Sequence, residues 1–169
     1  SKKDARPILY TAWHTLAYTG LRRGELLGLE WSDIDFKNKT ISVSKTLFTI
    51  NGKLSTQSPK TKRSARTISL DDSTVQILKE WKLEQKKLFF KHGIKSKNII
   101  ITNTKGNYFD FAHFRDELRC FLGKHKLKQF SVHSLRHTHA SLLFEAGIEP
   151  KTISDRLGHS NIQTTLDMY

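Results

Sequence analysis

The chain has 169 residues, of which 37% are hydrophobic, and this is enough for a single domain with its own core. Lysines and arginines number 29 against 16 aspartates and glutamates, which gives a formal charge of +13. An excess of this size predicts a polyanionic partner that binds more weakly as salt rises, on a basic face rather than a disordered arm. A solvated basic surface without a dedicated partner is the alternative.

A single cysteine, Cys120, excludes an internal disulfide and fits a reducing cytoplasm. Because Leu118 and Phe121 flank it, we expect a buried structural thiol. No apolar run is long enough to span a bilayer and no signal peptide opens the chain, so we expect a cytoplasmic protein without a membrane partner.

The N-terminal part predicts two helices. Apolar residues recur at helical spacing from Ile8 to Ala17, and this helix should stop near Gly20. The segment TGLRRGELLGLEW follows, and in it Arg22 opens a second helix.

Strands are predicted next. A turn at residues 33–36 leads into an alternating run in which Ile41 and Val43 face one side. Residues 47–50 form a second strand, followed by the hairpin signal Asn51-Gly52. The basic stretch SPKTKRSAR then predicts a mobile hairpin tip that leads into a strand at residues 67–70.

Helices dominate the remainder of the chain. Asp71 and Asp72 can cap a helix that runs to about residue 92, with a buried side formed by Leu78, Trp81, Leu88 and Phe89. A short apolar segment at residues 98–102 precedes another helix over residues 109–122.

The C-terminal segment predicts three more helices. Ser131 suits the N-cap of the first, and its apolar face comprises Leu135, His139, Leu142 and Ala146. Pro150 suits the first turn of the second, which Gly158 closes. The third has a face formed by Ile162, Leu166 and Tyr169. The sum is one mainly helical α+β domain, residues 1–169, with a small antiparallel sheet.

His133 and Arg136 lie three residues apart and so share a helix face. Since Ser131 would place both in the first turns, where unpaired N–H groups favour an anion, we expect them to bind a phosphate. His133 and His137 also have the i, i+4 spacing of zinc helices. However, Ser134 stands where a catalytic glutamate is needed and no third ligand follows, so we expect no metal.

Tyr169 is ambiguous from its spacing alone. Its alignment with Ile162 and Leu166 is more typical of a core or interface aromatic than of a nucleophile.

Four motifs, TGLRRGE, PKTKRSAR, HSLRH and LGHSNIQTTLDMY, occur in this order. Together they resemble the catalytic domain of the tyrosine recombinases, also called phage integrases, and most closely the integrases of Gram-positive phages and integrative transposons. The resemblance covers nearly the whole chain. It implies the tyrosine recombinase catalytic-domain fold and reverses the expectation for Tyr169, which becomes the nucleophile.

The resemblance implies a role for each matching basic residue. Arg22 and Arg136 would hold the non-bridging oxygens of the scissile phosphodiester, whose negative charge grows in the transition state. Lys60 would protonate the leaving 5′-hydroxyl, with Lys62 as the alternative acid. Lys62 and Arg63 would otherwise contact the DNA backbone.

The same resemblance implies the remaining roles. His133 would be a second acid or base, and His159 would donate to the phosphate or help to place the tyrosine. Tyr169 would form a 3′-phosphotyrosyl link that a 5′-hydroxyl resolves. Ionising a free phenol at pH 7 costs roughly 4 kcal/mol, which nearby cations would lower. Glu25 would orient a neighbouring cation. Because the link conserves the phosphodiester energy, no cofactor is implied.

The implied function is site-specific integration and excision of a mobile element or prophage at double-stranded DNA attachment sites. We expect four full-length protomers on two duplexes, with directionality factors and host DNA-bending factors as further partners. N-terminal DNA-binding domains and a C-terminal tail are expected outside this chain. A catalytically silent basic DNA-binding module and a type IB topoisomerase-like enzyme are the alternatives.

Overall fold

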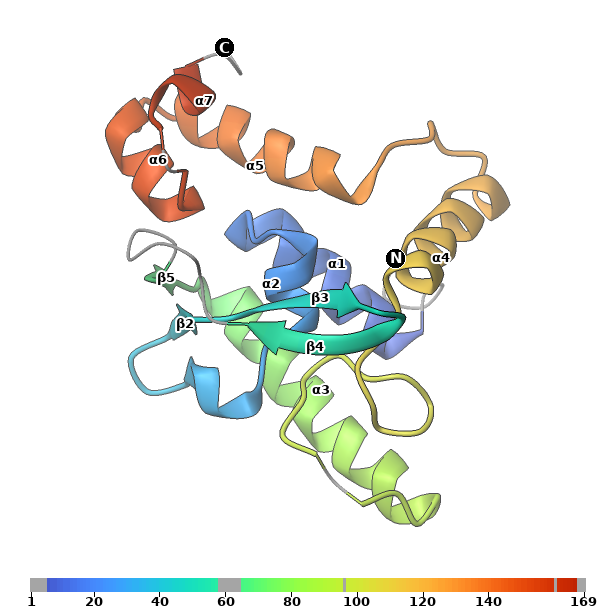
Figure 1. Ribbon diagram of the computed structural model, residues 1–169. Helices are drawn as coiled ribbons and strands as arrows, with labels where there is room; N and C mark the ends of the chain where they lie inside the picture. Colours follow the sequence, from blue (N-terminus) through green and yellow to red (C-terminus); the bar gives the residue numbers. More distant parts are fainter. Residues whose placement is uncertain (1–5, 58–64, 96, 160, 167–169) are drawn as a thin grey trace.

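The computed structural model describes residues 6–57, 65–95, 97–159 and 161–166. Its helices surround a central pair, α1 and α2, and two small sheets lie against this pair (Figure 1). The predictions that concern Lys60, Lys62, Arg63 and Tyr169 lie outside the described residues.

The two predicted N-terminal helices are confirmed. α1 (Pro7–Thr19) has proline in its first turn. It ends at Gly20, which adopts φ 66° and donates its backbone N–H to the carbonyl of Leu16. α2 (Arg23–Leu27) follows at once, because Arg22 is its N-cap residue. The bend between these helices places Arg22 beside the end of α1.

The described strands form two antiparallel sheets. After the short 3-10 turn Trp31–Asp33, one sheet has the order β1-β2-β5, with β1 (Ile34–Asp35), β2 (Thr40–Val43) and β5 (Arg66–Ser69). The other sheet pairs β3 (Thr46–Ile50) with β4 (Lys53–Gln57). Asn51 and Gly52 have φ of 47° and 74°, so the hairpin predicted from this dipeptide is confirmed.

The strands that flank the basic stretch pair with different neighbours. β4 pairs with β3 and β5 pairs with β2, so the described strands on either side of residues 58–64 belong to different sheets. The basic stretch predicted as a hairpin tip falls mostly on residues 58–64, so that prediction lies outside the described residues.

The next two helices are confirmed, although α4 lies two residues later than the predicted 109–122, and they correct two burial predictions. α3 (Asp72–Lys91) begins at the Asp71 cap, but Leu88 is 37% exposed. In α4 (Phe111–Lys124) Cys120 is exposed, which contradicts the predicted buried thiol. The buried residues of α4 recur every fourth position, so Cys120 falls on the opposite face; they are Phe114, Leu118 and Leu122.

The C-terminal helices are α5 (Val132–Glu145), α6 (Pro150–Leu157) and α7 (Gln163–Leu166). The Ser131 cap is confirmed, since its hydroxyl accepts from the Ser134 N–H. The face predicted for α5 is confirmed in its first half, where His139 is buried and Leu135 packs against the core, and wrong in its second half, where Leu142 is 58% exposed. The buried residues of α5 are Val132, Arg136, His139 and Ala140. Half of this face is polar, so a hydrophobic pattern could reveal it only in part.

The main core joins α1, α2, α3 and α4 to both sheets, and a smaller cluster of Ala140, Ile153 and Leu157 lies between α5 and α6. α5 (orange) packs against α1, with α6 and α7 at its far end (Figure 1). The predicted α+β class is confirmed. Within the described ranges, no helix has the length and apolar character needed to cross a bilayer.

Candidate active site

Arg22 lies at the start of α2, and its side chain is partly exposed to solvent. Its Nη1 donates to Glu25 Oε1 at 2.9 Å, and its backbone N–H donates to Glu25 Oε2 at 2.8 Å. Its Nη2 donates to the carbonyl of Gly158 at 2.8 Å. The side chain remains 41% exposed, so these contacts fix the guanidinium while one side of it faces solvent.

Arg136 enters the same region from α5 and is buried. Its Nη1 donates to the carbonyl of Gly20 at 2.6 Å and its Nη2 to the carbonyl of Leu157 at 2.8 Å. Burial, followed by the charge of Arg22, lowers the pKa of Arg136 to about 9. The group is therefore still charged at neutral pH, and its charge lies close to that of Arg22.

Arg66 is a third arginine at this centre, and the sequence interpretation missed it. Its Nε donates to the carbonyl of Arg156 at 2.7 Å, and its two Nη atoms donate to the two oxygens of Glu25 at 3.0 and 2.9 Å. The available signal was alternation, because Arg66 lies two and four positions before Ile68 and Leu70, both of which are buried.

The C-terminal end of α6 binds all three arginines. Three successive carbonyls, of residues 156, 157 and 158, accept from Arg66, Arg136 and Arg22 respectively. We call these carbonyls the α6 carbonyl triplet. The last carbonyls of a helix have no partner within it and carry the negative end of its dipole, so they favour cations. Segments far apart in the sequence are thereby tied to one helix end.

Glu25 is the carboxylate that pairs with these arginines, and its side chain is 6% exposed. Burial by itself raises the pKa of Glu25, but the hydrogen bonds and charge of Arg66, with those of Arg22, outweigh it and bring the pKa below its ordinary value. The residue is therefore ionised at neutral pH. Its predicted orienting role has a geometric basis, since the carboxylate bridges Arg22 and Arg66.

Two histidines adjoin the arginines. His133 lies at the start of α5 with its ring edge-to-face with His137, and burial, then His137 and the arginines, lower its pKa. His159 follows Gly158, and its Nδ1 lies 2.8 Å from Thr165 Oγ1. Burial, then Arg136 and Arg22, lower the pKa of His159 to about 4. Both rings are therefore neutral at neutral pH.

The described structure thus brings together four of the six predicted catalytic residues, Arg22, His133, Arg136 and His159. A cluster of fixed guanidiniums beside neutral imidazoles can bind an oxyanion and exchange protons with groups attached to it. The contributions of Lys60 and Tyr169 remain predictions.

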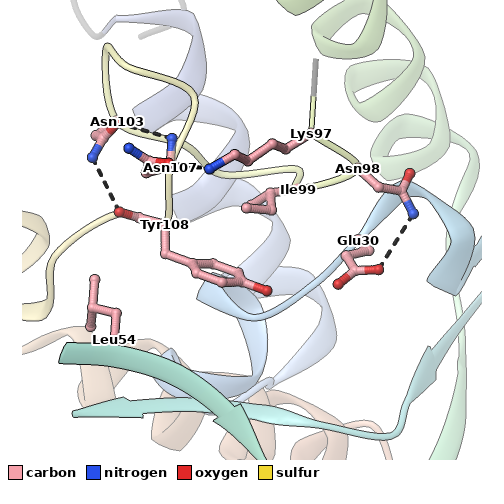
Figure 2. Close-up of a pocket in the computed structure, with 8 residues that line it drawn as sticks. All are labelled: Glu30, Leu54, Lys97, Asn98, Ile99, Asn103, Asn107 and Tyr108. Carbon is pink, nitrogen blue, oxygen red and sulfur yellow. Dashed lines mark hydrogen bonds between the residues drawn. The ribbon is translucent and has the colours of Figure 1, made fainter. Parts of the chain in front are cut away.

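A polar pocket of about 580 Å³ lies elsewhere, next to the β3–β4 hairpin (Figure 2). Its side chains largely bond to one another: Asn98 donates to Glu30, and the Lys97 ammonium contacts Asn107. None of the four predicted catalytic residues that the structure describes, Arg22, His133, Arg136 and His159, lines it. The cationic cluster is therefore the stronger candidate for chemistry.

The phage integrase family model matches residues 3–169. The chain belongs to this family. It is 35% identical over 164 residues to the ICEBs1 integrase of Bacillus subtilis, covering 96% of this chain and 45% of that protein. It is 37% identical over 165 residues to a XerC-like tyrosine recombinase of Caldanaerobacter subterraneus, covering 89% and 42%. This integrase-family chain spans less than half the length of those two relatives.

Solved structures agree with the family. The Tn1549 transposon integrase in complex with a circular intermediate DNA superposes with a TM-score of 0.84 at 28% identity, covering 95% of this chain and 53% of that one. The XerA recombinase superposes with a TM-score of 0.71 at 22% identity, covering 99% and 58%. The predicted tyrosine recombinase catalytic-domain fold is thereby confirmed for this integrase-family chain.

Replacing Gly158 by alanine should destabilise the protein more than the same change at a glycine of similar backbone geometry. A Cβ at Gly158 would lie 2.8 Å from Arg66 Nη1, whereas one at Gly147 meets nothing within 4 Å, and both glycines have positive φ. Gly147→Ala should cost about 1–2 kcal/mol from backbone strain alone. Gly158→Ala should cost at least ~1 kcal/mol more, measured by urea unfolding. Equal costs would contradict a tight fit of Arg66 against this turn.

His139 should make stability depend on pH. Its Nε2 accepts from Arg156 Nε at 3.2 Å, and burial, then the charge of Arg156, lower its pKa to about 4. The unfolded chain gains a proton near pH 6.5 and the folded chain only near pH 4, so the unfolding free energy falls as pH drops through this window. The deficit of His139→Gln, about 1 kcal/mol at pH 7.5, should therefore shrink towards pH 4.5. Urea unfolding across this range measures it, and a constant deficit would contradict the assignment.

Proposed function

We propose that this chain is the catalytic domain of a site-specific DNA integrase that breaks and rejoins strands through a 3′-phosphotyrosyl link. The observation that carries the proposal is the convergence of Arg22, Arg136, His133 and His159 on one cationic centre. The 28% identity to the Tn1549 integrase, whose solved structures contain DNA, supports DNA as the substrate.

The arginines would bind the scissile phosphate. Arg22 has a fixed, half-exposed guanidinium, and Arg136 adds a second permanent charge behind it. Charge develops on the non-bridging oxygens during attack, so donors fixed beforehand lower the barrier more than mobile ones. His159 is neutral, and if its Nδ1 accepts from the Thr165 hydroxyl, its Nε2 carries the hydrogen and can donate to the same phosphate.

The reacting groups complete the proposal. The Tyr169 oxygen would attack phosphorus and pass its proton to His133 as the bond between phosphorus and the 5′-oxygen breaks. Lys60, or Lys62, would supply the proton that converts the leaving oxygen to a hydroxyl. Rejoining would reverse these steps with a 5′-hydroxyl from the partner strand.

The function of the whole protein is proposed from its relatives. The ICEBs1 integrase and the integrase of Staphylococcus phage L54a, which is 34% identical, support integration and excision of a mobile element at double-stranded attachment sites. We propose four full-length protomers on two duplexes, with directionality and DNA-bending factors as further partners. Lys62 and Arg63 would contribute contacts to the DNA backbone.

The first test of this function is a covalent adduct. The protein is incubated without metal with a nicked suicide duplex that carries the element's end sequence. A protein–DNA adduct should appear on a denaturing gel and should be absent for Tyr169→Phe, because the phenylalanine ring lacks the attacking oxygen. Salt-sensitive binding without an adduct would favour a silent DNA-binding module. Plasmid relaxation without sequence preference would favour a topoisomerase.

Neighbouring arginines supply a matched pair for the phosphate-binding role. Arg22→Lys should lower the cleavage rate at saturating DNA by about 10²- to 10³-fold, because a point charge cannot hold Glu25, the Gly158 carbonyl and a phosphate together. Arg23→Lys should stay within about threefold of the parent, since the Arg23 guanidinium lies over the Phe111 ring instead. Single-turnover cleavage measures both, and equal losses would argue against a special role for Arg22.

A further inference from the structure

We propose that Arg66 is a positioning residue that balances the charge of Glu25 and so leaves Arg22 and Arg136 available to a phosphate. The inference rests on the proposed function, because it concerns the same centre. It also makes a prediction about anion binding that does not require DNA cleavage.

Arg66 is placed to act through its neighbours, not by touching DNA. Its side chain is 6% exposed, against 41% for Arg22, although both contact the same carboxylate. Its contacts with Glu25 and with the Arg156 carbonyl direct it into the protein. A buried guanidinium in this position influences a ligand through the groups that it holds.

The charge balance at Glu25 is the first effect. Arg66 donates to both carboxylate oxygens of Glu25 in a bidentate ion pair, whereas the Arg22 side chain donates to only one of them. Such a pair satisfies the carboxylate's charge locally, so Arg22 keeps most of its own. Without Arg66, a buried carboxylate would have to pair with Arg22 alone. That pairing would cancel the charge of Arg22 and draw its guanidinium away from the open side.

The second effect of Arg66 is on the α6 carbonyl triplet. Arg66 donates to the first of the three carbonyls, and Arg136 and Arg22 donate to the next two. A contact at residue 156 therefore helps to fix the acceptors on which the other two arginines rest. The packing of Arg66 against Gly158 fixes the turn that leads to His159.

The test compares four proteins: the parent, Arg66→Gln, the double variant Glu25→Gln/Arg66→Gln, and Lys87→Gln. Lys87 is a charge-matched control, because it is exposed and lies on α3, which supplies none of the arginines or histidines of this centre. The double variant removes both charges of the pair. The amide that replaces the Glu25 carboxylate can still accept from the backbone N–H of Arg22 through its oxygen.

Two readouts are taken on each protein. Affinity for inorganic phosphate is obtained from the rise in melting temperature with phosphate concentration. The single-turnover cleavage rate is obtained on the suicide duplex at saturating DNA, so that weaker DNA binding does not enter. Circular dichroism reports whether each variant is folded.

Arg66→Gln should bind phosphate about tenfold more weakly and cleave about 10- to 100-fold more slowly than the parent. The double variant should recover most of the phosphate affinity and at least about a tenth of the parent rate, because the unbalanced carboxylate is gone. Lys87→Gln should stay within about twofold of the parent in both readouts. Such recovery is specific to charge balance. If the pair were purely structural, removing it would lower stability without selectively weakening phosphate binding.

Two results would overturn the inference: an Arg66→Gln variant that binds phosphate as Lys87→Gln does, or a double variant no better than Arg66→Gln. If Arg66→Gln does not fold, Arg66→Lys takes its place. Lysine keeps the positive charge but cannot pair with both oxygens of Glu25 at once. Phosphate affinity should therefore stay within about threefold of the parent value, while the cleavage rate should fall by more than threefold. Failure of every protein to form an adduct, with the expected phosphate series, would reject the proposed function and leave the role of Arg66 intact.

Discussion

The C-terminal end of α6 is the anchor of the candidate active site. Its last carbonyls are unpaired within the helix, and Gly158, at φ 69°, turns the chain so that three successive carbonyls face the arginines. Arg22, Arg66 and Arg136 come from α2, β5 and α5, and each donates to one of these carbonyls. The helix end therefore fixes the positions of α2, β5 and α5 relative to one another.

Holding like charges together has a physical cost that this arrangement offsets. Arg136 is buried, and burial and the neighbouring charge of Arg22 both disfavour its protonated form. Two carbonyls accept from Arg136, and Glu25 contributes a favourable charge. The same field keeps His133 and His159 neutral, because protonating them would add to the positive charge. At neutral pH the centre therefore combines charged guanidiniums with neutral imidazole rings, as the proposed phosphate binding and proton transfer require.

Much of the fold can be predicted from local sequence signals, whereas the candidate active site can be predicted only in part. Proline and glycine at helix ends, the Ser131 cap and the Asn51-Gly52 turn act over a few residues, so the sequence predicts them well. Cys120 was misplaced because its apolar neighbours belong to a different helix face. Arg66 was missed for another reason: its partners lie 41 and 90 positions away, and no local pattern can show that a strand residue will meet them.

The geometry of Arg22 suggests how one side chain can be both anchored and free to bind. A guanidinium has five N–H donors. Its contacts with Glu25 and Gly158 engage Nη1 and Nη2 once each, so among the described contacts the second hydrogens and the Nε–H remain for a ligand. A phosphate can then bind without displacing the anchors, and little reorganisation is needed as negative charge develops. Because Gly158 also precedes His159 directly, the contact that fixes Arg22 helps to fix the histidine, and both would approach the phosphate as one rigid unit.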